Sequence, residues 1–326
     1  MESIDPKSLQ EAVVVFSNPA NCLAYLVPRR WPNGVVICPT CGSNRVAFQE
    51  HRLRWQCATH HPKRQFSIKV GTIFEDSPLG LDKWLPAVWL LTNCKNGVSS
   101  WELHRAIDVT QKTAWFMLHR IRLAHQGKDG GKMGGPGSEI EADETFIGGE
   151  ARNMHKSVRA RKITGTGGKD KTIVMGILER GGKVRAKVVT NRRKRQLQAE
   201  IRNNVEAGSE VFTDALKSYA GLSEFQHQVI DHAEKYVDGK VHTNGLENFW
   251  SLLKRGLGGT YVSVEPFHLF RYLDEQMFRY NNRKDETGEP VNDAARFDLA
   301  IRQIVGKRLT YAELTGKLEE TAATAF

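Results

Sequence analysis

The sequence has no long apolar run, and this absence argues against an integral membrane protein. Among its 326 residues, no stretch approaches the roughly 20 consecutive apolar residues that a membrane-spanning helix needs. The first residues also lack the basic and then apolar pattern of a secretory signal peptide. Internal repeats and low-complexity tracts are absent, whereas hydrophobic residues, at 40%, are ample for a buried core. We therefore expect a cytoplasmic protein with more than one globular domain and no membrane association.

Cysteine is scarce, and its placement indicates a metal site. The chain has five cysteines, an odd number, which argues against a disulfide framework and for a reducing compartment. Cys38 and Cys41 form a CxxC knuckle, and Cys57 and His60 follow after a segment with strand-like alternation. Two tight turns joined by a hairpin direct four ligands at one point, as a structural zinc site requires. We predict that Cys38, Cys41, Cys57 and His60 bind Zn²⁺, with His61 as the alternative fourth ligand.

Acidic residues are the minority among the charged residues. The chain has 47 Lys and Arg residues against 37 Asp and Glu residues, which gives a net charge of +10. Such an excess favours a polyanionic partner such as nucleic acid, although solvation of the surface accounts equally for a modest excess. The charge balance therefore indicates a class of partner and needs local motifs to support it.

Residues 97–124 carry such a motif. Ser99 and Glu102 have the spacing of a capping box, and Thr110 is placed to begin a second helix after a short turn. Apolar residues on both segments are spaced to face inward, which is typical of a helix-turn-helix. A helical hairpin without a DNA role fits the same spacing. On the first interpretation, the base-reading residues are Gln111, Lys112 and Thr113, and the phosphate-contacting residues are Arg120 and Arg122.

The pattern changes to strands from Ser138 onward. Apolar and acidic residues alternate through residue 146, which predicts a strand with acids on one face, and the spacing does not choose between Glu141 and Asp143. Residues 172–178 and 183–189 flank a glycine pair and predict a hairpin; a helix at 192–205 and short strands at 210–214 and 228–230 follow. This order predicts a mixed five-stranded sheet with flanking helices, an α/β ribonuclease H-like arrangement.

The stretch from residue 242 to 257 predicts an amphipathic helix. Its apolar residues recur at helical spacing, and Glu247 and Lys254 lie on a neighbouring stripe. An exposed Glu–Lys pair would give the same pattern. In a ribonuclease H-like sheet, however, the first and fourth strands are adjacent, so the acid of the first strand would meet Asp214, and Glu247 would approach from the helix above. Close acids repel unless cations neutralise them, so we predict two Mg²⁺ or Mn²⁺ ions about 3.5–4 Å apart that support phosphodiester transfer.

Several short motifs together resemble the DDE transposases of bacterial insertion sequences, in the branch with an N-terminal zinc ribbon. They are CPTCG at residues 38–42, GTIF at 71–74, KTAW at 112–115, EADET at 141–145, TD at 213–214, HTNGLENFWSLLKR at 242–255 and RLTY at 308–311. The resemblance implies an enzyme that binds the terminal inverted repeats of an element, cuts there and joins the freed 3′-hydroxyl to target DNA.

The resemblance also assigns residues. By the family motif, the catalytic and metal-binding acids are Asp143, Asp214 and Glu247, so that Asp143 rather than Glu141 is the first acid. Some relatives carry Asn as the third ligand, and Asn244 and Asn248 therefore stay candidates. The basic residue that follows the third acid contacts DNA in such enzymes, and here the matching residue is Lys254; its neighbour Arg255 is a further DNA-binding candidate.

The resemblance further implies double-stranded DNA as the partner and, because two ends must be paired, a homodimer or higher assembly at the nucleoid. The alternatives are a nuclease that does not join strands and a non-catalytic zinc-ribbon regulator. The expected segments are the N-terminal helix and zinc ribbon (1–75), the helix-turn-helix region (76–126), a linker (127–137), the catalytic core (138–284) and a helical tail (285–326).

Overall fold

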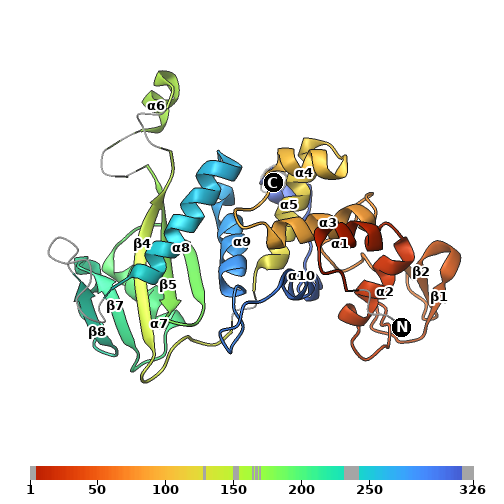
Figure 1. Cartoon of the computed structure of the whole chain (residues 1–326), viewed down its shortest axis with the longest axis horizontal. Coiled ribbons are helices and arrows are strands. Elements are labelled where there is room, and N and C mark those ends of the chain that lie inside the picture. The colour runs from red at the N-terminus through yellow and green to blue at the C-terminus, as the bar shows by residue number, and fades with distance from the viewer. Residues whose placement is uncertain are drawn as a thin grey trace, which may run out of the picture. The chain divides into compact units, whose positions relative to one another are not determined.

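The chain forms two compact units, seen in the computed structural model of Figure 1. The structure describes residues 5–127, 130–149, 154–163, 165, 168, 170–230 and 242–317. The first unit combines residues 1–127 with residues 291–326, and the second unit is residues 128–290. Residues 291–317 of the segment that was expected to form a separate tail (285–326) therefore belong to the N-terminal unit, whereas residues 285–290 belong to the second unit. Within the described ranges, no helix is both long and apolar enough to cross a membrane.

The first unit is mainly helical. Its helices are α1 (Leu9–Phe16), α2 (Pro19–Arg30), α3 (Leu81–Asn93), α4 (Ser100–Ile107), α5 (Gln111–His125), α10 (Asp293–Arg302) and α11 (Tyr311–Leu314). The ring of Phe297 on α10 lies 5.9 Å from that of Phe16, 5.5 Å from Tyr25 and 5.1 Å from Trp89, measured between centroids. Arg29 on α2 donates to Asp298 at 2.5 Å. One aromatic core thus joins the beginning and the end of the chain.

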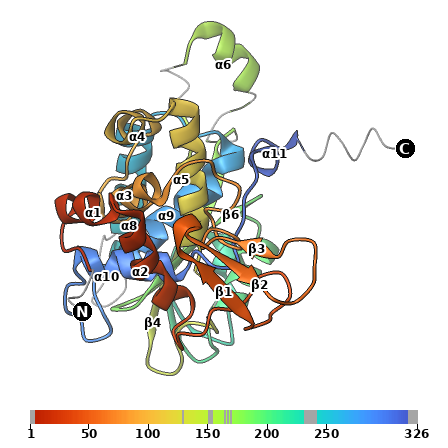
Figure 2. The ribbon, with the colours of Figure 1, turned by 90° about the vertical axis from the view of Figure 1, so that its right-hand side faces the viewer.

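A small antiparallel sheet belongs to the same unit. It consists of β1 (Val46–Gln49), β2 (Arg54–Cys57) and β3 (Gln65–Phe66), with a 3-10 turn at Glu50–Arg52 between the first two strands, and is visible in Figure 2. The register places Trp55 opposite both Phe48 and Phe66. Since opposite residues in an antiparallel pair share a face, these rings pack together, and Trp31 adds an edge contact to Trp55 at 5.7 Å.

Helices α4 and α5 begin where the sequence analysis expected. The Ser99–Glu102 capping box is present, and the side chain of Thr110 accepts a hydrogen bond from the Thr113 amide at the start of α5. Asp108 adopts a left-handed conformation with φ of 51°, which reverses the chain between the two helices. The residues of α5 from Met117 onward are buried, so this helix is also a central core element of the unit.

The second unit contains the five-stranded mixed sheet that was predicted. Its strands are β4 (Glu139–Ile147), β5 (Thr172–Glu179), β6 (Val184–Val189), β7 (Glu210–Asp214) and β8 (Gln226–Ile230). Their order is β6-β5-β4-β7-β8; the first three are antiparallel, and β7 is parallel to both β4 and β8. The first and fourth strands of the unit are therefore neighbours, as the ribonuclease H-like arrangement requires.

Helices cover both faces of this sheet: α7 (Lys194–Asn204) packs on one face, and α8 (Asn244–Arg255) and α9 (Leu269–Asn281) pack on the other. The unit also contains α6 (Lys156–Lys162), which projects away from the sheet (Figure 1), 3-10 turns at Lys217–Tyr219 and Pro266–His268, and a π-helical turn at Gly256–Tyr261. Ile140 and Ala142 pack with the core under α7, whereas Val174 and Leu178 of β5 pack with α8 and α9. Because side chains alternate along a strand, Glu141 and Asp143 point to the face that α8 covers.

Candidate metal centres and DNA-binding residues

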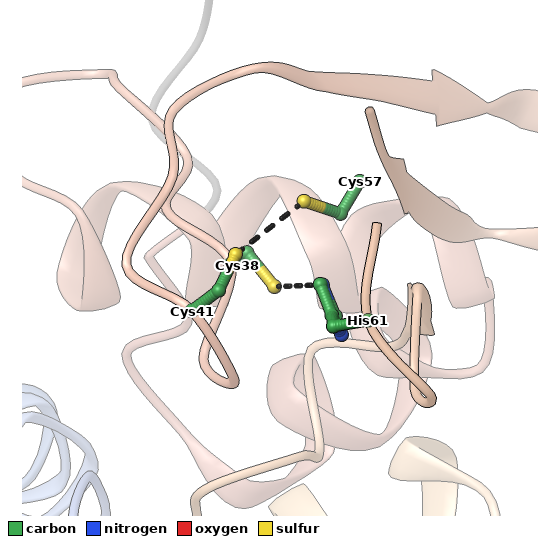
Figure 3. Close-up of side chains that lie close together, drawn as sticks. All are labelled: Cys38, Cys41, Cys57 and His61. Carbon is green, nitrogen blue, oxygen red and sulfur yellow. Dashed lines mark hydrogen bonds between the residues drawn. The ribbon is translucent and has the colours of Figure 1, made fainter. Parts of the chain in front are cut away.

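Three cysteines and one histidine come together beside the small sheet. The Sγ atoms of Cys38, Cys41 and Cys57 and a ring nitrogen of His61 all lie within 4.8 Å of one another (Figure 3). Cys38 Sγ lies 3.5 Å from His61 Nε2, and Cys41 Sγ lies 3.6 Å from Cys57 Sγ. Cys38 and Cys41 come from the knuckle, and Cys57 ends β2. The cysteine part of the predicted zinc site is thus assembled.

The fourth member of the group corrects the prediction. His61, half-buried, faces the three thiols, whereas His60 is exposed and lies outside the group. The reason is the direction of the chain after β2. Successive side chains point to different sides of the turn, so His61 points toward the thiols and the adjacent His60 points away from them.

The donor set suits a structural zinc ion. Thiolates and imidazole are the ligands that zinc prefers in closed tetrahedral sites. Burial raises the pKa of the Cys57 thiol, but hydrogen bonds from His61 and from the backbone at Thr59 outweigh it and lower that pKa to about 6. The thiolate, which is the form that binds metal, is therefore favoured at neutral pH.

In the second unit, Asp143 and Asp214 lie on adjacent strands. The parallel register pairs Glu141 with Phe212, so Asp143 and Asp214, two residues further along each strand, share a level and a face. Burial raises the pKa of Asp143 to about 7; a hydrogen bond from Trp250 opposes the shift, and the charges of Glu144 and Asp214 add to it. A pair of mutually repelling carboxylates at one sheet position fits a divalent cation, because such an ion prefers oxygen ligands and would offset the repulsion.

The structure separates Glu141 from Asp143, which the spacing left open. Both oxygens of Glu141 accept hydrogen bonds within the protein, one from Arg180 Nε and one from the Leu246 amide, each at 2.9 Å. Asp143 instead accepts from Trp250 Nε1 at 2.9 Å and is the acid that senses the charge of Asp214. The geometry therefore favours Asp143 as the acid available to a metal.

The third expected acid lies on the helix above these two. Glu247 is an exposed residue in the first turn of α8, one turn before Trp250, and α8 packs on β4 and β5 (Figure 1). Asn244 and Asn248 are also exposed on this helix. Within the part of the chain that the structure describes, the cysteine–histidine group is the one set of three or more side chains close enough to hold a metal ion, so Asp143, Asp214 and Glu247 do not form such a set.

The three residues expected to read bases, Gln111, Lys112 and Thr113, lie at the start of α5 and differ in exposure. Lys112 is exposed, with Nζ 4.8 Å from the centre of the Tyr311 ring. Gln111 donates to Ser100 Oγ at 2.8 Å, and the hydroxyls of Thr110 and Thr113 are 2.8 Å apart. Lys112 is thus the member of the set that is exposed at the surface.

Arg120 was wrongly predicted to contact phosphate. Its side chain is buried with 3% exposure, donates to the carbonyl oxygen of Glu75 and lies over the rings of Trp84 and Phe116 at 5.4 and 5.3 Å. Burial lowers its pKa to about 10, so it stays protonated at neutral pH. Arg122, at 1% exposure, is likewise buried. Both face inward because α5 packs into the unit around most of its circumference. By contrast, Lys254 and Arg255 are exposed in the last turn of α8.

Two residues at the acid site were missed by the sequence analysis. Trp250 is one of the apolar residues that recur at helical spacing in residues 242–257, and this pattern gives no sign of its hydrogen bond to Asp143. Arg180, at the end of β5, was not singled out, since a basic residue beside a glycine turn has no spacing that identifies its partners. It pairs with Glu139 and Glu141.

Comparison with known proteins identifies the family of this chain. Residues 133–281 match the ISXO2-like transposase domain, and residues 17–59 match the transposase zinc-ribbon domain. The chain is 31% identical over 279 residues to a protein from Halobacterium salinarum described as an uncharacterized protein in transposable element ISH50, covering 80% of this chain and 90% of that protein. A second relative is an uncharacterized transposase-like protein of Haemophilus influenzae, to which the chain is 36% identical over 102 residues. The matched segment covers 31% of this chain and 82% of that protein. The chain therefore belongs to the ISXO2-like DDE transposases of insertion sequences, in the branch that carries an N-terminal zinc ribbon.

Proposed function

We propose that this protein is a transposase that binds the terminal inverted repeats of its insertion sequence, cleaves DNA there and transfers the freed strand to target DNA. The observation that carries the proposal is the placement of Asp143 and Asp214 on adjacent strands, under the helix that carries Glu247. Asp143, Asp214 and Glu247 would hold Mg²⁺ or Mn²⁺, with Asn244 and Asn248 as further oxygen donors nearby. Two such ions would activate the attacking oxygen and stabilise the leaving one.

The chain's own residues set up this chemistry. The indole of Trp250 donates to Asp143 and orients its carboxylate. Burial, with smaller contributions from the charges of Glu144 and Asp214, raises the pKa of Asp143 and disfavours its ionised form, which a bound cation would stabilise. Lys254 and Arg255 would contact phosphates near α8, and Lys112 would contact the repeat through the helix-turn-helix formed by α4 and α5.

The reaction has two steps. Water attacks the phosphodiester at the element end, the bond to the 3′ oxygen breaks, and that oxygen leaves as a hydroxyl. This hydroxyl then attacks a target phosphodiester, forming a new bond to phosphorus as a target 3′-hydroxyl leaves. We further propose that the protein acts as a homodimer or larger assembly on paired ends at the bacterial nucleoid.

The test uses the purified zinc-loaded protein, Mg²⁺ or Mn²⁺, and a labelled duplex carrying the terminal repeat from the DNA that flanks this reading frame. Products longer than the substrate would demonstrate strand transfer, and cleavage without them would favour the nuclease alternative. Asp143→Asn and Asp214→Asn should each abolish cleavage while DNA binding persists. Cleavage that survives both substitutions would reject the assignment, and specific binding without cleavage by the unmodified protein would favour the regulator.

A further inference from the structure

A buried ion-pair network links the sheet to the segment that leads into α8. The guanidinium of Arg180 donates through Nε to Glu141 and through Nη1 to Glu139, both at 2.9 Å, and through Nη2 to the carbonyl oxygen of His242 at 2.8 Å. It also stacks over the ring of Phe212 at 4.4 Å. The side chain of Glu141 is only 1% exposed. Arg180 thus ties β4 and β5 to the residues immediately before the helix.

Glu141 also acts as the N-terminal cap of α8. The preceding residue, Thr243, makes no side-chain cap hydrogen bond, and the Leu246 amide in the first turn donates to Glu141 Oε2 at 2.9 Å. A carboxylate at this position satisfies a free amide and interacts favourably with the positive end of the helix dipole. The capped residue directly precedes Glu247, so the cap locates the backbone of the expected third acid.

A second hydrogen bond fixes the same helix one turn further on. Trp250 donates to Asp143, which lies two residues after Glu141 on β4. Two residues of strand span about 6.8 Å, and the four residues from Leu246 to Trp250 span about 6 Å of helix. The spacing of Glu141 and Asp143 along β4 is therefore close to the spacing of their donors, Leu246 and Trp250, along α8.

Two glycines allow the helix to come this close. A Cβ at Gly176 would lie 2.6 Å from the ring of Trp250 and 2.8 Å from the side chain of Leu246. A Cβ at Gly245 would lie 2.8 Å from Glu141 Oε2. All three distances are shorter than real Cβ contacts, so an alanine at either position would force a shift between α8 and the sheet.

We propose that Glu141, held by Arg180, is a positioning residue that sets the distance of Glu247 from Asp143 and thereby the affinity of the acid site for divalent metal. The proposal rests on the proposed function, because it assumes that these acids bind the metal. Glu141 itself has both oxygens engaged and does not ligate the ion. Its effect passes through the first turn of α8.

The test compares Glu141→Gln with Glu139→Gln in the zinc-loaded full-length protein. The first substitution gives Arg180 and the Leu246 amide a side chain that cannot accept from both, whereas the second removes the other carboxylate of Arg180 and leaves the cap in place. Hydrogen–deuterium exchange should accelerate in α8 from residue 244 to 250 for Glu141→Gln and change little for Glu139→Gln. This readout needs neither metal nor activity.

Binding of Mn²⁺, followed by electron paramagnetic resonance, provides the second measurement. The binding that Asp143→Asn removes defines the acid site. Glu141→Gln should raise its dissociation constant about 10- to 100-fold, as loss of an outer partner does at other metal sites, and Glu139→Gln should not. A residue that only stabilised the fold would lower the unfolding temperature without changing Mn²⁺ affinity in the folded protein, and that result would overturn the proposal.

Gly245→Ala provides an independent variant that keeps every charge. It adds a methyl group against Glu141 Oε2 but suits a helix better than glycine, so folding should be retained while Mn²⁺ affinity falls. Unchanged affinity in both Gly245→Ala and Glu141→Gln would refute the positioning role. If the unmodified protein showed no Asp143-dependent Mn²⁺ binding, the proposed function itself would fail, which is a distinct outcome.

Discussion

Asp143 is a half-buried carboxyl group whose ionisation opposes folding when no cation is bound. Its pKa is raised from 3.8 to about 7 in the folded protein, chiefly by burial. Between these two pH values, the folded state retains a proton that the unfolded state loses. The unfolding free energy of the protein free of Mg²⁺ and Mn²⁺ therefore falls as pH rises through this window, by up to about 1.4 kcal/mol per unit.

Asp143→Asn should remove this dependence. Relative to the unmodified protein, the variant should gain about 2–3 kcal/mol of unfolding free energy between pH 5 and pH 8, as measured by denaturant titration without Mg²⁺ or Mn²⁺. Asp285→Asn is the control, because hydrogen bonding from Thr287 lowers the pKa of that exposed acid below its ordinary value, so the contribution of Asp285 to the unfolding free energy does not change between pH 5 and pH 8. A stability difference for Asp143→Asn that stays constant with pH would contradict the expected charge effect.

The neighbouring histidines of the zinc ribbon make a matched pair. His61→Ala should release zinc, because it removes one of four ligands, whereas His60→Ala should retain it. Zinc content by mass spectrometry of the native protein measures the result directly. Equal loss of zinc in the two variants would mean that the turn exchanges ligands, and loss from His60→Ala alone would restore the assignment made from the sequence.

These residues show where sequence patterns stop being informative. Alternation along a strand was enough to place acids on one face of β4, and the strand order then brought Asp143 beside Asp214. The choice of His60 over His61 depended on the direction of one turn, which spacing does not encode. Arg120 had the spacing of a surface cation, but the packing of α5 on other elements, which no local pattern records, buries it.

At the level of elements, the close contact of α8 with the sheet depends on the absence of a side chain at Gly176 on β5. Gly176→Ala would place a Cβ within 2.8 Å of both Trp250 and Leu246, and the helix would have to move away from β5. Overpacking of this kind typically costs about 1–3 kcal/mol. Thermal unfolding should show the loss, and the Trp250–Asp143 hydrogen bond should lengthen in a crystal structure of the variant.

Gly182→Ala is the matched control, since its Cβ would meet the flexible side chain of Glu179 at 3.1 Å rather than a packed helix. A similar loss of stability in the two variants would show that an added methyl group destabilises the β5–β6 hairpin at either position. The close approach of α8 would then not be the cause of the loss in Gly176→Ala. No loss in Gly176→Ala would show that α8 can shift at little cost.

The elements themselves were largely predictable in the second unit. The acid-bearing strand, the glycine hairpin and the short strand ending at Asp214 each have local signals, and their order determines the mixed sheet. The first unit was less predictable, because its core is assembled from distant parts of the chain. The separate helix α2 and the docking of α10 depend on apolar faces whose partners lie far away in sequence.

For the whole molecule, the main consequence is that the second unit is inserted between two parts of the first. Residues 291–317 return to the unit that residues 5–127 begin. Phe297 is fully buried among Phe16, Tyr25 and Trp89, and Lys307 donates to the carbonyl oxygen of Ala124 near the end of α5 at 3.1 Å. The fold of the first unit therefore depends on residues synthesised after the second unit.

Phe297→Ala should destabilise the first unit although it lies far from the ribbon in sequence. Removing a fully buried phenylalanine typically costs about 3–5 kcal/mol, whereas Phe267→Ala, at a residue 61% exposed in the second unit, should fall within about 0.5 kcal/mol of the unmodified protein. Limited proteolysis should then cut first within residues 5–127 of the Phe297→Ala variant, and the fragment spanning residues 128–290 should persist. First cleavage within residues 128–290 would mean that the C-terminal segment stabilises the second unit instead, and the division of the chain into a split first unit and an inserted second unit would be wrong.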